Sequence, residues 1–273
     1  MNYKDIAIKN TILRVLVGSQ AYGISVDDGK PSDRDEKGVC IEPLEVFMGF
    51  NGFEQYEYRS AVEREGHHQA KSQPGDLDLV IYSLHKFLRL ALKGNPQIME
   101  MFFIKDYVER NALGSMLQQL APYIVSKQCG KAYLGYMQAQ RMRLNGERGG
   151  KDVNRPELVE KYGYDTKYAM HVVRLGLQGI ELLQTGHLVL PLPEEQRGYL
   201  LGVRRGQFTL PEVLEKAQSL ETRLKELLNG DSPLPDQPDQ KHVEEWMIDT
   251  YWNWWRAQRF MLDREDLASR RVH

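Results

Sequence analysis

The sequence predicts an α+β protein in which a part of mixed strands and helices, residues 1–108, precedes an all-helical part, residues 109–273. An apolar run at 13–17 and an alternating acidic and aliphatic run at 76–82 are typical of strands. After about Arg110 the strand signals fade and helical periodicity replaces them. This change of pattern predicts two domains.

The bulk composition is that of an ordinary globular protein, with 273 residues, 41% hydrophobic and 27% charged. A formal net charge of −2 argues against coating nucleic acid by charge alone, but it permits a local basic patch. No apolar run approaches the roughly 20 residues of a membrane helix, and the first ten residues lack the apolar core of a secretion signal. Cys40 and Cys129 show no metal-binding spacing. We therefore expect a cytoplasmic protein with buried thiols and no membrane partner.

The first elements lead to a loop between two strands. Residues 3–11 are weakly amphipathic and predict a short helix or an extended lead-in to the strand at 13–17. Gly18-Ser19 ends that strand, a short helical turn follows, and residues 25–31 are loop by composition. A second strand is expected over residues 32–41.

The next segments alternate between polar and apolar patterns. Residues 54–74 are polar and predict a surface hairpin or long loop. After the strand at 76–82, Ser83 is placed to cap an amphipathic helix over 84–93. Gly94-Asn95-Pro96 then ends this helix.

The remainder is helical, interrupted by an extended crossing at 188–193 and a proline-rich linker at 231–239. Four tryptophans in the last helix favour its docking on the body over stacking on bases. The expected helices cover residues 111–121, 129–144, 156–162, 166–185, 211–229 and 241–260.

Polar groups suited to metal and phosphate binding gather around the first two strands. Gly18-Ser19 offers backbone N–H groups and a hydroxyl to phosphate oxygens. Asp33 and Asp35, two residues apart on an extended strand, point to one face with Cα atoms roughly 6.5–7 Å apart. Asp78 on a later strand is the candidate third carboxylate, and Asp76 lies on the same strand face as a rival.

Such carboxylates are the ligands that Mg²⁺ or Mn²⁺ prefers beside phosphate oxygens. Two metal ions about 3.5–4 Å apart steer an in-line attack on an α-phosphate. One lowers the pKa of the attacking hydroxyl, and the other neutralises the triphosphate and the departing pyrophosphate.

These motifs resemble a known family. The pattern GSxAYG, then SDxDxxGV, then DxxxYSLxKF is similar to the DNA polymerase beta superfamily of nucleotidyltransferases, and more narrowly to predicted nucleotidyltransferases of bacterial and phage RNA-repair systems. The likeness continues through most of the chain. Its further positions are Tyr82-Ser83-Leu84, Lys86-Phe87, Gly94-Asn95-Pro96, Tyr164-Asp165-Thr166-Lys167, His171, Arg174-Leu175, Gly186 and 190–193, with a weaker match at Leu234-Pro235.

The resemblance implies a mixed-sheet catalytic domain that transfers a nucleoside monophosphate from an NTP to a hydroxyl. It places Asp33 and Asp35 on the paired metal carboxylates and Asp78 on the third. Gly18 and Ser19 fall on the triphosphate loop. The expected acceptor is an RNA 3′ end, either tRNA-like or damaged.

Cationic residues supply candidate contacts to the triphosphate or the acceptor. Lys167, His171 and Arg174 share one helix face at i, i+4 and i+7, where they favour nucleotide binding over an ordinary polar face. Two further basic groups are present. A stripe expected to be solvated consists of Lys86, Arg89 and Lys93. A second group, expected to be either an RNA contact or plain surface, consists of Arg141, Arg143, Arg148, Lys151 and Arg155.

Two other functions remain open on the sequence. One is adenylyl transfer to a protein or small molecule, and the other is a non-catalytic nucleotide- or RNA-binding module. The chain has no Walker loop, GxSxG elbow or HExxH motif, which counts against P-loop ATPase, hydrolase and zinc-protease functions.

Overall fold

The computed structural model describes residues 2–25, 34–67, 70, 73, 75–144 and 155–269, with side chains as far as residue 259. Asp33, Arg148 and Lys151, which carry expectations from the sequence, lie outside the described residues.

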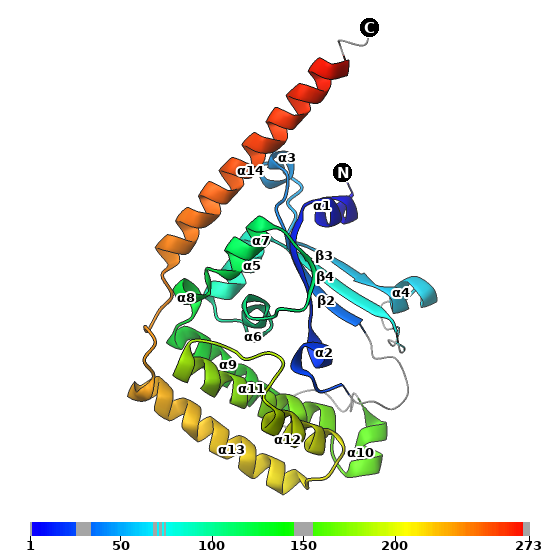
Figure 1. Cartoon of the computed structure of the whole chain (residues 1–273). Coiled ribbons are helices and arrows are strands. Elements are labelled where there is room, and N and C mark those ends of the chain that lie inside the picture. Colours follow the sequence, from blue (N-terminus) through cyan, green and yellow to red (C-terminus); the bar gives the residue numbers. More distant parts are fainter. Residues whose placement is uncertain are drawn as a thin grey trace.

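A five-stranded mixed sheet forms the centre of the N-terminal part and confirms the α+β class (Figure 1). The strand order is β3-β4-β2-β1-β5, with β2 parallel to β4 and the other neighbours antiparallel. The strands are β1 (Thr11–Leu16), β2 (Arg34–Cys40), β3 (Gln55–Arg59), β4 (Leu77–Ser83) and β5 (Tyr107–Arg110). Because β2 and β4 are adjacent and parallel, the residues at their starts lie at the same edge of the sheet.

The two edge strands, β3 and β5, were not predicted because their sequences are polar. The expected loop or hairpin at 54–74 is wrong in part, because β3 and the helix α4 (Ser60–Glu65) form there. Only Tyr56 and Tyr58 of β3 pack against a core cluster, so the strand reads as polar. The strand β5 pairs with β1 and continues the sheet to Arg110, so the sequence boundary at residue 108 lies within this strand.

Short helices connect and cover the strands. Asn2 caps the first of them, and the Ser83 hydroxyl accepts from the Lys86 N–H at 3.1 Å, as expected of a helix N-cap. Besides α4, the N-terminal helices are α1 (Tyr3–Lys9), α2 (Gly18–Tyr22), α3 (Leu44–Phe47), α5 (Leu84–Leu92), α6 (Pro96–Met99) and the 3₁₀ turn η1 (Glu100–Phe102).

The C-terminal part is helical, as expected. The helix expected at 111–121 is divided into two, and α12 was not predicted because its polar sequence buries only Leu200, Gly202 and Val203. The helices are α7 (Ala112–Gln118), α8 (Ala121–Ile124), α9 (Lys127–Leu144), α10 (Pro156–Tyr162), α11 (Thr166–Thr185), α12 (Glu194–Arg204), α13 (Leu210–Glu226), the π turn η2 (Leu227–Asp231) and α14 (Gln240–Ser269).

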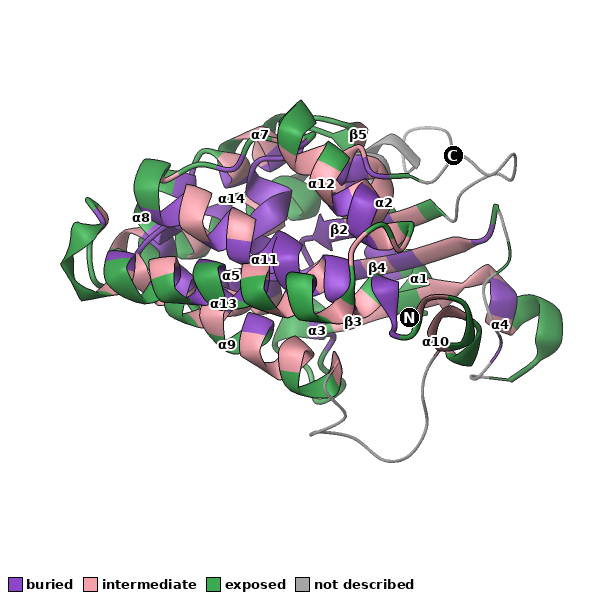
Figure 2. Ribbon diagram, turned by 90° about the horizontal axis from the view of Figure 1, so that it is seen from below, coloured by how far each residue is buried: buried purple, intermediate pink, exposed green. Residues whose placement is uncertain are grey.

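The helix α11 forms the centre of the helical part, between α9 and α13 (Figure 1). A Cβ at Gly176 would lie 2.9 Å from the Leu220 side chain, and one at Gly179 would lie 3.0 Å from Leu224 and Tyr133. These glycines let the neighbouring helices approach closely. Figure 2 shows buried residues along α11 and along β2 and β4, and one continuous core joins the sheet to the helices.

The last helix returns to the N-terminal part. The Trp255 indole N–H donates to the Glu42 carbonyl at 3.0 Å, and the Tyr251 hydroxyl accepts from the His85 N–H at 3.0 Å. The Phe47 ring packs against Tyr251, 5.1 Å between centroids. The expected docking of the tryptophan-rich helix is confirmed.

Candidate active site

Two of the three predicted metal carboxylates are brought together at the start of neighbouring strands. Asp35 of β2 and Asp78 of β4 are paired residues in the parallel register. Neighbouring strands lie about 4.8 Å apart, and paired residues point to the same face of the sheet. On that face Val39 of β2 belongs to the core under the helical part. Asp33, two residues before Asp35, lies outside the described residues.

Gly18 lies directly against the Asp35 carboxylate. Its φ of +71° is in the left-handed region that favours glycine, and a Cβ there would lie 2.6 Å from Asp35 Oδ2. The Val17 N–H also donates to the Asp35 carbonyl at 2.9 Å. The Gly18-Ser19 turn is therefore fixed beside a candidate metal ligand, and any larger residue at position 18 would fill that space.

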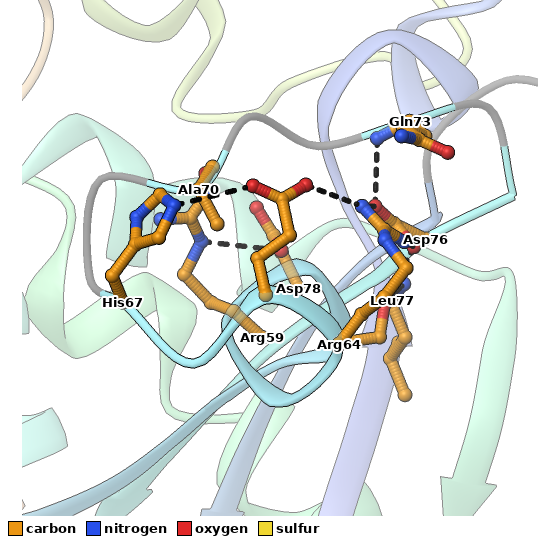
Figure 3. A network of polar contacts seen from close by, with 10 residues as sticks. Arg59, Arg64, His67, Ala70, Gln73, Asp76, Leu77 and Asp78 are labelled. Carbon is orange, nitrogen blue, oxygen red and sulfur yellow. Dashed lines mark hydrogen bonds and ion pairs between the residues drawn. The ribbon is translucent and has the colours of Figure 1, made fainter.

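The two rival carboxylates of the later strand have different surroundings (Figure 3). Arg64 donates to both oxygens of Asp76, at 2.7 and 3.1 Å, and the Gln73 N–H and Ser60 hydroxyl donate as well. These donors lower the pKa of Asp76 to about 2.

Asp78 instead lies beside Arg59, 3.4 Å from its Nε, and faces Asp35 across the strand pair. Asp76 precedes β4 and is held in a local network, whereas Asp78 lies within β4 in register with Asp35.

The face formed by Lys167, His171 and Arg174 runs from the surface into the interior. Lys167 is exposed, whereas Arg174 is only 5% exposed. The Arg174 guanidinium lies over the ring of Tyr22, 4.1 Å from its centroid, and donates to Gln178 at 2.6 Å. The three residues therefore do not form one exposed cationic face.

His171 is a neutral group in this setting. Burial lowers its pKa to about 3, with further lowering from the neighbouring charges of Arg174, Lys167 and Arg155. At neutral pH it is an imidazole that donates or accepts a hydrogen bond, and it adds no positive charge.

Three residues near Asp35 were not singled out from the sequence. Lys37 follows Asp35 by two positions, so the strand period already placed it on the same face. Tyr22 lies in the Gly-Ser turn motif, and its hydroxyl donates to Glu100. Glu100 itself lies far away in the sequence, and no pattern pointed to it.

Most described members of the two other basic groups form ion pairs with acidic side chains. Lys86 and Arg89 contact Glu54 at 3.0 and 2.8 Å, as a solvated stripe would. Arg141 pairs with Glu221 and Arg155 with Asp165, both at 3.2 Å.

The described ranges contain no group of three His, Cys, Asp or Glu side chains placed to hold a metal. Asp35 and Asp78 are hard oxygen groups in register on adjacent strands, of the kind that a divalent cation prefers, and Gly18 leaves no Cβ between its backbone and the Asp35 carboxylate. Both features agree with a divalent metal site.

A mixed sheet that carries in-register carboxylates beside a Gly-Ser turn agrees with the nucleotidyltransferase motifs of the sequence. A family model described as "RNA repair pathway DNA polymerase beta family" (RlaP) matches residues 3–250. The chain belongs to this family and is a nucleotidyltransferase associated with RNA repair.

Other comparisons add little to the family match. No curated protein matches the chain. A crystal structure of a nucleotidyltransferase-like protein from Exiguobacterium sibiricum 255-15 is similar, at 13% identity over 83% of this chain and 71% of that one, with a TM-score of 0.29. That score is too low to equate individual elements. Among the described residues, no helix is long and apolar enough to cross a membrane.

Proposed function

We propose that this protein transfers a nucleoside monophosphate from an NTP to the 3′-hydroxyl of an RNA end, with divalent metal ions held by Asp33, Asp35 and Asp78. The observation that carries the proposal is the pairing of Asp35 with Asp78 on adjacent parallel strands, directly beside Gly18. It supports a site where carboxylates and a phosphate-binding turn act on the same group.

Each residue has a defined role in this proposal. Mg²⁺ or Mn²⁺, when bound, would lower the pKa of the attacking hydroxyl and neutralise charge on the triphosphate. Gly18 and Ser19 hold the phosphates through backbone N–H groups and the hydroxyl. Asp78 completes the first metal site and accepts the proton of the attacking 3′-hydroxyl.

The helix α11 forms the opposite wall in this proposal. Lys167, exposed in its first turn, meets the β- and γ-phosphates or the acceptor backbone as a point charge. The neutral His171 contributes a hydrogen bond. Arg174, buried with its guanidinium over the Tyr22 ring, acts on the nucleotide site through that ring.

An RNA acceptor is favoured by the family description. Arg143 adds an exposed positive charge near the end of α9. Transfer to a protein side chain or a small molecule uses the same chemistry at the NTP. The acceptor is therefore the feature that the first experiment must identify.

The test incubates the protein with each labelled NTP, Mg²⁺ and total RNA. Label in RNA supports the proposal, whereas label in a protein band or a small molecule supports the alternative acceptor. Nucleotide binding without incorporation indicates a non-catalytic module.

Asp35→Asn should lower transfer at least about 10²-fold without unfolding the protein. The matched control is Asp5→Asn, because Asp5 is a surface acid paired with Lys9 on α1. Full activity in Asp35→Asn would overturn the metal assignment.

A further inference from the structure

A buried carboxylate lies where the sheet, the Gly-Ser turn and the helical part meet. Glu100 is 3% exposed. It accepts a hydrogen bond from the Tyr22 hydroxyl of α2. Its other neighbours are Lys37 Nζ of β2, at 3.7 Å, and Arg174 Nη1 of α11, at 4.0 Å. We call these four residues the Glu100 cluster.

The cluster is held together by charge. The side chains of Lys37 and Arg174 are only 13% and 6% exposed, and both lie beside the Glu100 carboxylate. Buried cations are tolerated when a nearby anion compensates them, and removing that anion leaves them unpaired. Among the acidic residues that the structure describes, Glu100 contacts both cations and Tyr22.

The cluster acts on the short helix that begins with the Gly-Ser turn. With five residues, α2 is too short to be stable by itself, so contacts with other elements must fix its position. Tyr22 ends it, and its hydroxyl is fixed by Glu100 while its ring lies under Arg174.

Two more contacts come from α12 and the segment before it. The Leu192 N–H donates to the Tyr22 carbonyl at 3.3 Å, and the Arg197 side chain lies against Gly23. Tertiary contacts from the helical part therefore set where Gly18 and Ser19 lie.

We infer that Glu100 is a positioning residue for the nucleotide site: it holds Tyr22, and thereby α2, so that Gly18 and Ser19 stay against Asp35. The inference rests on the proposed role of Gly18 and Ser19 in binding the triphosphate. Glu100 is too deeply buried to touch the nucleotide, and its effect passes through Tyr22.

The test is the dissociation constant for NTP with Mg²⁺, measured by equilibrium binding. Glu100→Gln keeps the volume and an acceptor for Tyr22 but removes the charge between the two cations. It should raise Kd about tenfold, as loss of one charge-assisted interaction would. In transfer assays KM for NTP should rise by a similar factor, whereas loss of folded protein would lower only the apparent kcat.

Glu221→Gln is the matched control. Glu221 is also 3% exposed and lies 3.2 Å from Arg141 of α9 and 2.8 Å from Lys225 of α13, so its ion pairs do not involve α2. It should lower the melting temperature with Kd unchanged. If Glu100→Gln also leaves Kd unchanged, the inference is overturned.

Tyr22→Phe covers the case in which Glu100→Gln does not fold. It removes only the hydroxyl and should raise Kd about fivefold; an unchanged Kd overturns the inference. If the wild-type protein binds NTP but labels no RNA, the proposed acceptor is overturned, and the Kd values of the variants still test the role of Glu100. Wild-type protein that binds no NTP overturns both proposals.

Discussion

Gly18→Ala tests how closely the phosphate-binding turn must approach the metal carboxylate. At φ +71° an alanine costs about 1–2 kcal/mol in the backbone. Its Cβ would also lie 2.6 Å from Asp35 Oδ2, so the carboxylate must move by about 0.8 Å to reach an ordinary contact of 3.4 Å. A misplacement near 1 Å at reacting groups costs about 10²-fold in rate. We expect that loss in kcat/KM.

Gly163→Ala separates the two costs. Its φ of +80° imposes the same backbone strain, but no atom of the described residues lies within 4 Å of the added Cβ. Both variants should melt lower, by about 2–4 °C for each kcal/mol. Only Gly18→Ala should lose nucleotidyl transfer to RNA, measured under saturating Mg²⁺. Equal activity in the two variants would refute the required close approach.

Three further predictions concern individual carboxylates. Asp78→Asn should lower transfer at least about 10²-fold. Asp76→Asn should leave the transfer rate near that of the wild type, because Asp76 is already held by Arg64, whereas Asp78 is in register with Asp35. Equal losses in the two variants would contradict the proposal of Asp78 as the third carboxylate. The pKa of Asp76 falls from 3.8 to about 2, so its contribution to stability is present above pH 4 and is lost as pH falls toward 2. The melting difference between wild type and Asp76→Asn should therefore shrink over that window, and a constant difference would argue against it. Burial raises the pKa of Glu42 from 4.5 to about 7, so the folded state binds the extra proton and stability falls as pH rises between those values. Glu42→Gln should remove that fall, which melting curves at pH 5 and 8 would detect; an unchanged pH dependence would exclude Glu42 as its source.

The fold was predictable where local pattern and final environment agree. The helices expected at 156–162 and 166–185 have those bounds in the structure, where Asp165 caps the start of the second helix and Gly186 caps its end. The edge strand β3 was missed because only its two tyrosines face a core. An edge strand has few apolar neighbours, so its alternation is weak.

The candidate site divides in the same way. Strand period alone placed Asp35 and Lys37 on one face, and the chain order brought Gly18-Ser19 between the two strands. The proposal of Asp78 over Asp76 as the third carboxylate draws on the parallel register of β4 with β2 and on the donors around Asp76. Register depends on strand pairing, which a single sequence does not contain.

The chain's residue order determined the family likeness, the two structural parts and the groups able to bind metal and phosphate. Tertiary structure decided which of those groups meet. It buried Arg174 against the Tyr22 ring, although helical spacing placed it with the exposed Lys167, because one helix face can run from solvent into an interface. It also brought Glu100 to the far end of the Gly-Ser turn. Such meetings depend on packing between distant elements, and short-range periodicity does not encode them.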